Sequence, residues 1–594
     1  MGLPNPIREY TESVPQYESS DNNSLQYTTE VGGNTSKATY QEASGAPVEV
    51  NSPLGYSVGW VTVIFLNLSK MIGTGVFSTR AYNSSLDCLK IYLHPIASAV
   101  VKGAGSVGLT LIYWVIGYLM ASSCLSVYME FASAFPSRSG SEVVYLEQSY
   151  PRPKYFFPTV FAMQTVLFSF SSSNAVVLAQ YLFKLGDSEF TPWKLKGVAV
   201  ACYTVAVLVL AFHTRWSLRL ANAIGLVKLL TLIFIAMTGL VVLGGHTSVK
   251  DPKANFRNAF EGTGAATAYG ATNALTKVWF SFAGYENAFN VVNEVRNPVK
   301  TLKWSAPLSL GLTAVLYVLA NIAYFSAASK EEILDSKVVA AGVFFEKVFG
   351  TGSAASALNF LICMSAFGNL LAVLIGQSRM LRECGRLVTN QCVYSESVCS
   401  NALFGYRQGV LPFTSFWTLT RPFGTPLGPY FVKWSFTVLM ILAPPAGDAF
   451  NFVVDLGVYA TSIFGLVLTI GLVVTRIRRA HLSLPAPDYK AWHITVAFAI
   501  LSNLYMVVMP WYPPSTGANG GDVSFWYATY CAVAVGIVGL CGVYYYVWIK
   551  LLPRIQGFKW EQTVLKLDNG ALAHRLVRVP KKTEGCDNVT QEVK

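Results

Sequence analysis

The chain has 594 residues, of which 53% are apolar and 13% are charged, about half the roughly 25% charged share of soluble globular proteins. This composition excludes an ordinary soluble enzyme, a disordered chain and a nucleic-acid binder, although the formal net charge is +12. Most of that charge lies in short loops between apolar segments, as membrane topology requires. The sequence shows no CxxC pair, no His cluster and no Walker, kinase or hydrolase motif. We therefore expect free cysteines, no metal, no bound cofactor and no enzymatic activity.

The two ends of the chain are polar. Residues 1–52 contain seven acidic and two basic side chains and no apolar segment behind a basic start. This pattern predicts a disordered cytoplasmic tail without a signal peptide. Residues 553–594 are polar with a basic bias and are expected to form a second cytoplasmic tail. Residues 53–552 are expected to form the membrane domain.

Twelve apolar stretches separate the tails, most of them long enough to cross a membrane at about 20 residues each. The fold expected is an all-α integral membrane protein with both termini on one side. Inner loops would carry 17 Lys and Arg against 11 in outer loops, which favours cytoplasmic termini. A short amphipathic helix is expected at 338–350. The stretches lie near 56–79, 104–128, 156–183, 194–213, 219–244, 270–293, 304–327, 353–376, 424–444, 447–475, 490–510 and 524–550.

The first stretch contains Gly73-Thr74-Gly75. Glycine costs about 1 kcal/mol in a helix interior relative to alanine, so this segment favours an unwound backbone. In lipid, exposed N–H groups must face protein, water or a ligand, and such groups at the start of a half-helix bind anions. The alternative is close helix packing through small residues.

The sixth stretch carries a second candidate break near Ala283-Gly284, followed by Tyr285 and Glu286. Paired breaks in corresponding spans of two halves indicate a transporter site at the bilayer midplane. The first break would offer N–H groups to a carboxylate and the second would offer carbonyls to an ammonium. An α-amino acid carries both groups, although an amine or a sugar stays open on these grounds.

The same residues carry a resemblance to a known family. The segments MIGTGVF (71–77), NFRNAFEGTGAATAYGATNAL (255–275) and VWFSFAGYENAFNVVNEVRNPVKTLK (278–303) resemble the amino acid–polyamine–organocation superfamily, and within it the L-type transporters of the fungal methionine permease group. Further similarity lies in ILAPPAGDAF (441–450) and VYYYVWIKLLPR (543–554). The resemblance implies a five-plus-five inverted repeat with discontinuous spans 1 and 6 and two extra spans.

The resemblance also implies roles for individual residues. Gly73, Thr74 and Gly75 would hold the substrate carboxylate, and the carbonyls of Met71 and Ala283 would hold the amine. Phe280 matches the aromatic side chain that closes over the substrate, and Gly284 and Tyr285 would shape the pocket for the substrate side chain.

Two ionisable residues inside apolar spans are candidates for ion coupling. Lys228 lies in the middle of the fifth span, where related transporters have a lysine near the cation site of sodium-coupled relatives. It could relay the driving proton or replace sodium, and a snorkelling side chain is the alternative. Glu286 could be a coupling carboxylate or a solvated vestibule residue. Glu130 and Glu142, in the loop after the second span, are expected to fix loop geometry rather than to move protons.

Two segments depart from the family pattern. Residues 81–95 intervene after the first span, and residues 387–407 intervene between RECGR (382–386) and QGVLPF (408–413). They are either extra loops or retained introns of a gene model, and we favour the second interpretation. Neither segment interrupts the expected site.

Together these features predict secondary active, proton-coupled import of neutral L-amino acids, methionine first, across the plasma membrane by alternating access. The alternatives are a transporter-like nutrient sensor, or a permease for another amino acid or an amine. The N-terminal tail has a single lysine, Lys37. In fungal permeases such tails are targets of ubiquitin ligase adaptors, so Lys37 is a candidate regulatory site.

Overall fold

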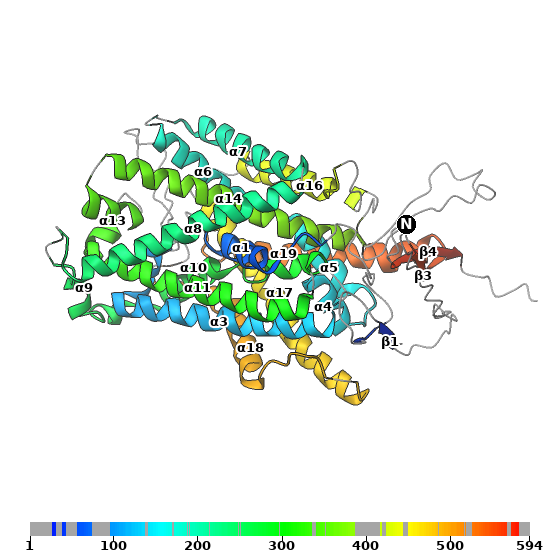
Figure 1. Ribbon diagram of the computed structural model, residues 1–594. Coiled ribbons are helices and arrows are strands. Elements are labelled where there is room, and N and C mark those ends of the chain that lie inside the picture. Colours follow the sequence, from blue (N-terminus) through cyan, green and yellow to red (C-terminus); the bar gives the residue numbers. More distant parts are fainter. Residues whose placement is uncertain are drawn as a thin grey trace, which may run out of the picture.

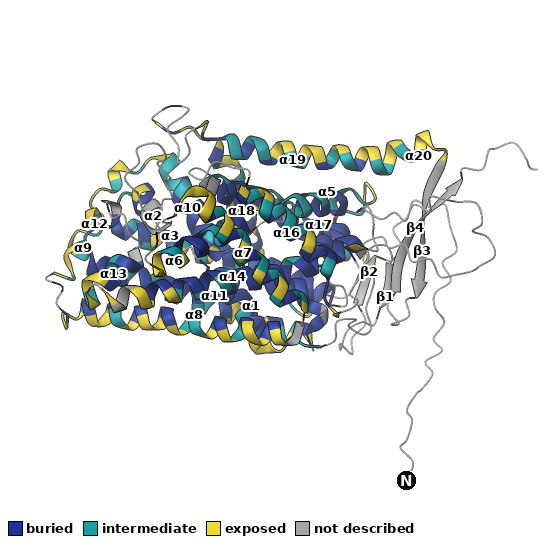
Figure 2. Cartoon of the chain, turned by 90° about the horizontal axis from the view of Figure 1, so that it is seen from above, coloured by how far each residue is buried: buried dark blue, intermediate teal, exposed yellow. Residues whose placement is uncertain are grey.

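A computed structural model describes most of the chain, and its helices form one elongated bundle (Figure 1). Helices α9 and α13 lie at one end of this bundle (Figures 1 and 2), and two small hairpins lie at the opposite end (Figure 1). The described residues are 27–30, 39–42, 56–73, 96–136, 140–168, 171–186, 188, 190–212, 214–247, 249, 251–295, 297–335, 340–350, 352–386, 411, 416–417, 423–442, 449–484, 486–515, 517, 525–566 and 572–580.

The bundle is built from long apolar helices. In the part of the chain that is described, nine helical segments are long and apolar enough to cross a membrane. Eight of these segments correspond to α3 Val107–Ala134, α7 Pro192–Phe212, α8 Thr214–Leu243, α11 Pro298–Ala327, α14 Ser353–Arg386, α17 Ala449–His481, α18 His493–Val508 and α19 Thr529–Tyr545, and the ninth is Phe156–Leu185. Helix α16 Leu427–Leu442 is also apolar but shorter.

Three spans are broken into shorter pieces: α1 Trp60–Met71 stops early, α5 Phe156–Leu167 is followed by α6 Ser172–Leu185, and α10 Ala268–Phe282 is followed by the 3-10 helix η2 Asn287–Glu294. Each of the twelve predicted stretches overlaps at least one of these helices, but twelve complete crossings stay a prediction. The short helix expected at 338–350 is present as α13 Ala340–Phe349.

The remaining elements are short: α2 Ile96–Ala104, α4 Glu142–Ser149, α9 Ala254–Arg257, η1 Thr263–Ala265, α12 Lys330–Asp335, η3 Met509–Trp511, the π-helical η4 Tyr546–Leu551 and α20 Leu552–Ile555. The tails differ from expectation, because they carry antiparallel hairpins that the sequence did not predict. Strands β1 Tyr27–Glu30 and β2 Thr39–Glu42 pair in the N-terminal tail, and β3 Phe558–Lys566 and β4 Leu572–Pro580 pair in the C-terminal tail.

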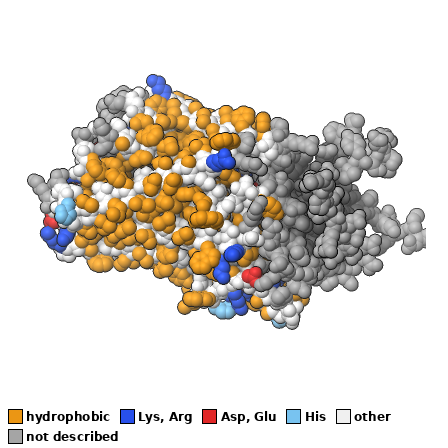
Figure 3. All heavy atoms as spheres, in the orientation of Figure 1, with side chains coloured by type: hydrophobic (Ala, Val, Ile, Leu, Met, Phe, Trp, Pro, Cys, Tyr) orange, Lys and Arg blue, Asp and Glu red, His pale blue; other side chains and the backbone are white. Residues whose placement is uncertain are grey.

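The outer surface of the bundle is apolar, and hydrophobic side chains cover most of its visible face (Figure 3). Large apolar side chains such as Leu230, Val315 and Leu540 are exposed on α8, α11 and α19. A surface of this kind is stable only against lipid or another apolar partner. Inside the bundle, Gly239 of α8 lets the helix approach Ala323 of α11, since a Cβ there would lie 2.2 Å from the alanine Cβ. Small residues at helix contacts are typical of membrane bundles.

Candidate functional site

Both predicted breaks coincide with helix ends. Helix α1 ends at Met71, and the amide of Gly73 donates to the Met71 carbonyl at 2.8 Å in a tight turn. Helix α10 ends at Phe282, and the backbone resumes a helical path only at Asn287. Thr74 and Gly75 lie outside the described residues, as does Lys37. The glycine-containing segments therefore end the two helices where their backbone preferences predict.

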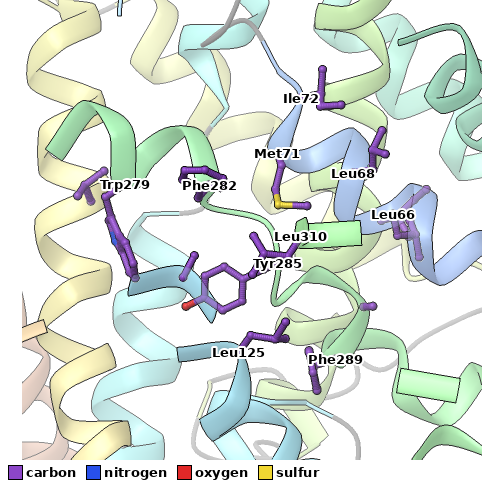
Figure 4. Close-up of a cluster of buried hydrophobic side chains, with 14 of the residues drawn as sticks. Leu66, Leu68, Met71, Ile72, Leu125, Trp279, Phe282, Tyr285, Phe289 and Leu310 are labelled. Carbon is purple, nitrogen blue, oxygen red and sulfur yellow. The ribbon is translucent and has the colours of Figure 1, made fainter. Parts of the chain in front are cut away.

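The two breaks lie against each other. Gly284 has φ +138°, a conformation that L side chains rarely adopt. A Cβ at this position would lie 2.9 Å from the Met71 nitrogen and 3.0 Å from the Lys70 carbonyl carbon. Figure 4 shows the Met71 side chain from α1 beside Tyr285 from the segment after α10. Glycine at 284 thus permits the direct contact of the two chain segments.

A cavity of about 260 Å³ opens at this junction. Its volume suits a small metabolite rather than a drug-sized ligand. The cavity is lined by side chains and backbone from α1, α3, α4, α5, α6, α10, η2, α14 and α17. The lining residues are Lys70, Met71, Gly73, Tyr128, Glu142, Phe161, Gln164, Thr165, Phe168, Ser171, Ser173, Asn174, Trp279, Phe280, Ser281, Ala283, Glu286, Asn290, Asn369, Val373, Gln377, Met380, Val453, Val454, Gly457, Val458, Thr461, Phe464 and Gly465.

Most of the described site residues predicted from the sequence meet at this cavity. Met71, Gly73, Phe280, Ala283 and Glu286 line it. The other three are set back from it.

Gly284 lies behind the cavity wall, at the contact between the two breaks. Tyr285 is buried, and its ring meets Tyr128 edge-on at 5.9 Å and Trp279 at 6.4 Å between centroids. Lys228 reaches the back of the α1 end and not the cavity itself.

The two carbonyls expected to hold an amine differ in the hydrogen bonds that they accept. The Met71 carbonyl accepts a hydrogen bond from the Tyr317 hydroxyl at 2.7 Å, in addition to the Gly73 amide. Tyr317 also donates to the Ser281 carbonyl at 3.1 Å, so it joins α11 to both broken spans. Among the described groups, none donates to the Ala283 carbonyl, which stands at the cavity wall.

Glu286 forms an ion pair with Lys70, a residue that the sequence analysis did not single out. The Lys70 Nζ lies 2.6 Å from Glu286 Oε1, and Glu286 Oε2 accepts from the Gly284 amide at 2.9 Å. Both side chains retain about 15% exposure (14% for Lys70 and 16% for Glu286). The pair therefore joins the two breaks at the wall of the cavity. The available signal was a lysine placed next to the MIGTG segment.

Lys228 is buried in the bundle, with 1% of its surface exposed. Its Nζ donates to the Ser69 carbonyl at 2.9 Å and to the Ile72 carbonyl at 2.7 Å. These carbonyls belong to the end of α1, where a helix has unpaired acceptors and partial negative charge. The Lys228 amino group therefore supplies donors to a helix C-terminus inside the bundle, in contrast to a snorkelling side chain.

A third interruption separates α5 from α6, and the sequence did not predict it. The Ser171 amide, before α6, donates to Thr437 Oγ1 at 3.1 Å, and Lys433 Nζ donates to Ser171 Oγ at 3.2 Å. Lys433 also donates to Gln377 Oε1. Both Ser171 and Gln377 line the cavity. The polar run SSSN at 171–174 within an apolar span was the signal for this interruption.

Buried ion pairs stand on either side of the break in the sixth span. Before the break, Lys277 of α10 lies 2.6 Å from Asp455 of α17. After the break, Glu294 of η2 lies 3.0 Å from Arg379 of α14, which also donates to the Tyr430 hydroxyl at 2.8 Å. These partners are far apart in the sequence, so local patterns gave no signal for either pair.

The chain is similar to several known proteins. Residues 58–389 and 390–540 match the family described as amino acid permease. The high-affinity methionine permease of Saccharomyces cerevisiae is 35% identical over 537 residues, covering 90% of this chain and 86% of the relative. The low-affinity methionine permease of the same yeast is 26% identical, covering 89% of each chain. Among solved structures, a manganese transporter mutant from Eremococcus coleocola aligns with TM-score 0.47 and 12% identity, covering 85% of this chain and 97% of that one.

Proposed function

The chain belongs to the amino acid permease family, and from this premise we propose that it imports neutral L-amino acids, methionine first, across the plasma membrane. As a permease it is a multi-pass membrane protein and not an enzyme. Methionine is favoured because the yeast relative that is 35% identical over 90% of this chain is a methionine permease. We further propose secondary active transport driven by protons.

The observation that carries the proposal is the meeting of two broken spans at one cavity. The amides of Gly73, Thr74 and Gly75 would hold the substrate carboxylate, because N–H groups at a half-helix start attract anions. The carbonyl of Ala283, which accepts no hydrogen bond from the described groups, would hold the substrate ammonium together with the carbonyl of Met71.

Substrate binding requires a local rearrangement in this scheme. The Met71 carbonyl is occupied by Tyr317 and by the Gly73 amide, so the substrate ammonium would compete with the tyrosine hydroxyl. Phe280 at the cavity wall would close over the substrate. Gly284 and Tyr285 would shape the side-chain pocket from behind that wall.

The geometry supports fixed-charge roles for the two coupling candidates. The Lys228 Nζ contacts the carbonyls of Ser69 and Ile72, which are oxygen ligands that a metal cation would otherwise bind. Glu286 has both carboxylate oxygens engaged, by Lys70 and by the Gly284 amide. We propose that Lys228 substitutes for a coupling cation and that Glu286 links the two breaks as a carboxylate.

Alternating access would move the broken spans relative to their neighbours around the cavity. With cytoplasmic termini, as the distribution of Lys and Arg favours, Val58 and η2 lie at the inner end of the bundle. There the Val58 amide donates to the Glu294 carbonyl at 3.1 Å. The ion pairs Lys277–Asp455 and Glu294–Arg379 would then lie on the outer and inner sides of the site.

The test is uptake of radiolabelled methionine in cells that lack their own methionine permeases, at two external pH values and with unlabelled competitors. Saturable uptake that increases in acid and is competed by methionine is the expected result. Methionine amide should compete at an amine site and fail to compete at an amino-acid site. Binding of methionine without uptake, with protein at the surface, would favour the nutrient-sensor alternative.

The N-terminal tail gives a separate regulatory proposal. Lys37 would accept ubiquitin through ligase adaptors that recognise the cytoplasmic tail. Substrate-induced internalisation should be lost in Lys37→Arg while uptake per surface molecule is unchanged. Internalisation at the parental rate would refute the assignment.

The segments 81–95 and 387–407 lie outside the described residues, and the two interpretations stay open. We propose that chains lacking both segments retain the site. Deletion variants should be monodisperse in detergent and should transport methionine. Aggregation of the deletion variants, with a monodisperse parent, would show that the segments belong to the folded protein.

A further inference from the structure

Two glutamates flank the loop between α3 and α4, and the structure gives them different environments. Both carboxylate oxygens of Glu130 accept hydrogen bonds: Arg476 Nε donates to Oε1 at 2.8 Å, and the Ala491 amide donates to Oε2 at 2.8 Å. Such a carboxylate fixes the loop, as expected from the sequence. Glu142 has a hydrogen bond at one oxygen only, from the Tyr128 hydroxyl to Oε1 at 2.7 Å. Its Oε2 is enclosed and has no partner among the described groups.

Glu142 also faces the proposed substrate cavity. It is the first residue of α4, whose eight residues span about 12 Å and so cannot cross a membrane. Its side chain lines the same cavity as Lys70 and Glu286. The Tyr128 hydroxyl donates a hydrogen bond to Glu142, and the ring of the same tyrosine meets the Tyr285 ring edge-on, with 5.9 Å between the ring centroids. Tyr128 therefore connects the protonation state of Glu142 to the break of the sixth span by direct contacts.

The ionisable groups around Glu142 give it no cation. None of the described lysine, arginine or histidine side chains forms an ion pair with it. On the cavity side, Glu286 is already paired with Lys70 at 2.6 Å and contributes negative charge.

Among the described residues of the elements packed against α4, no cation forms an ion pair with Glu142 either. On α14, Glu383 is paired with Arg382 at 3.2 Å, and the neighbouring Cys384 thiol is buried. On α17, Arg478 donates to the backbone carbonyl of Gln148. The other titratable groups nearby are the hydroxyls of Tyr128, Tyr145 and Tyr285.

An enclosed carboxylate without a cation is costly, and protonation removes that cost. Burial raises the pKa of the Glu142 carboxyl most strongly, and the charge of Glu286 acts in the same direction. The hydrogen bond from Tyr128 lowers this pKa, as do weaker interactions with the Glu142 amide and the Ser141 hydroxyl. Glu142 as a residue is partly exposed, and a substrate that fills the cavity would close this remaining access of water to it. Loss of water disfavours the ionised form of the carboxyl group.

We propose that Glu142 is the proton-binding carboxyl that links acid to amino acid binding, and hence the carrier of the symported proton. The inference rests on the proposed function. In the step, a hydronium ion in the cavity transfers its proton to the carboxylate, which leaves water and a neutral carboxylic acid. Release is the reverse transfer to water after the substrate departs. Because coupling is reciprocal, proton uptake on substrate binding means that acid tightens substrate binding.

The test is methionine binding to the purified full-length protein in detergent from pH 5 to pH 8. Linkage to one proton predicts that the parent gains up to about tenfold in affinity per unit of acidification. Glu142→Gln, which mimics the neutral acid, should bind with less than twofold variation across this range and at the parent's acid-limit affinity. Glu331→Gln, an exposed glutamate on α12, is the matched control and should retain the parental pH profile.

A second variant keeps the test decisive if Glu142→Gln folds poorly. Tyr128→Phe removes the hydrogen bond that favours the carboxylate, so the midpoint of the pH profile should move to higher pH. A parental pH profile in Glu142→Gln, an unmoved midpoint in Tyr128→Phe, or weaker binding by the parent in acid would each overturn the assignment. Absence of methionine binding by the parent at every pH would instead refute the proposed function.

Discussion

Replacement of Gly284 by alanine tests the contact between the two broken spans. An L residue at φ +138° is strained by about 1–3 kcal/mol. The new Cβ would also lie 2.9 Å from the Met71 nitrogen and 3.0 Å from the Lys70 carbonyl carbon, and these backbone atoms cannot rotate away. If this strain acts on the conformation that binds substrate, uptake should fall by about 5- to 150-fold, since 1.4 kcal/mol corresponds to a factor of ten.

The assay is initial-rate methionine uptake divided by the amount of protein at the cell surface. Gly536→Ala is the matched control, because Gly536 is also in a membrane helix and a Cβ there meets nothing within 4 Å. The control should transport at the parental rate. Uptake by Gly284→Ala within twofold of the parent would refute the reasoning, because it would mean that the two segments do not need to touch.

Three further predictions concern the charges and the first break. Lys277→Met should lower the free energy of unfolding of the purified protein by about 3–5 kcal/mol, because it leaves Asp455 buried without its cation. The double variant Lys277→Met/Asp455→Leu should recover the lost stability, and thermal unfolding in detergent distinguishes the two variants. An unchanged unfolding temperature in the single variant would contradict a stabilising role of this ion pair. Lys228→Met should reduce uptake at least about tenfold, because the buried carbonyls of Ser69 and Ile72 each lose a donor and a buried acceptor left short of donors costs about 1–3 kcal/mol, although Ser69 keeps its hydrogen bond from Asn369. Parental uptake would contradict a role for this contact. Gly75→Val should abolish uptake without loss of surface protein, and uptake within twofold of the parent would remove Gly75 from the carboxylate site.

The breaks were predictable because their causes are local. Glycine destabilises a helix at its own position, so the segments around Gly73 and Gly284 could be located without knowledge of the fold. Lys228 could also be identified, because a lysine in the middle of an apolar span needs a partner. The identity of that partner could not be predicted, since the carbonyls of Ser69 and Ile72 become acceptors only when α8 packs against the end of α1.

The missed features depend on contacts between distant segments. Lys277 and Asp455 are 178 residues apart, and only the packing of α10 against α17 makes them an ion pair. Glu130 and Glu142 look alike in the sequence, yet one meets Arg476 and the other meets none of the described cations. A polar run at 171–174 indicated the third interruption, but serine is tolerated in membrane helices and so is a weaker signal than glycine.

The end of α1 shows how a helix can stop inside a membrane. Its last carbonyls have no helical partner, so each needs a donor from the protein or from the contents of the cavity. The carbonyls of Ser69–Ile72 receive donors from three helices: Lys228 of α8, Tyr317 of α11 and Asn369 of α14. Movement of α1 therefore requires either that these donors move with it or that another donor replaces them. The ammonium of an amino acid is such a donor, which gives a physical reason why substrate binding could release the α1 end for transport.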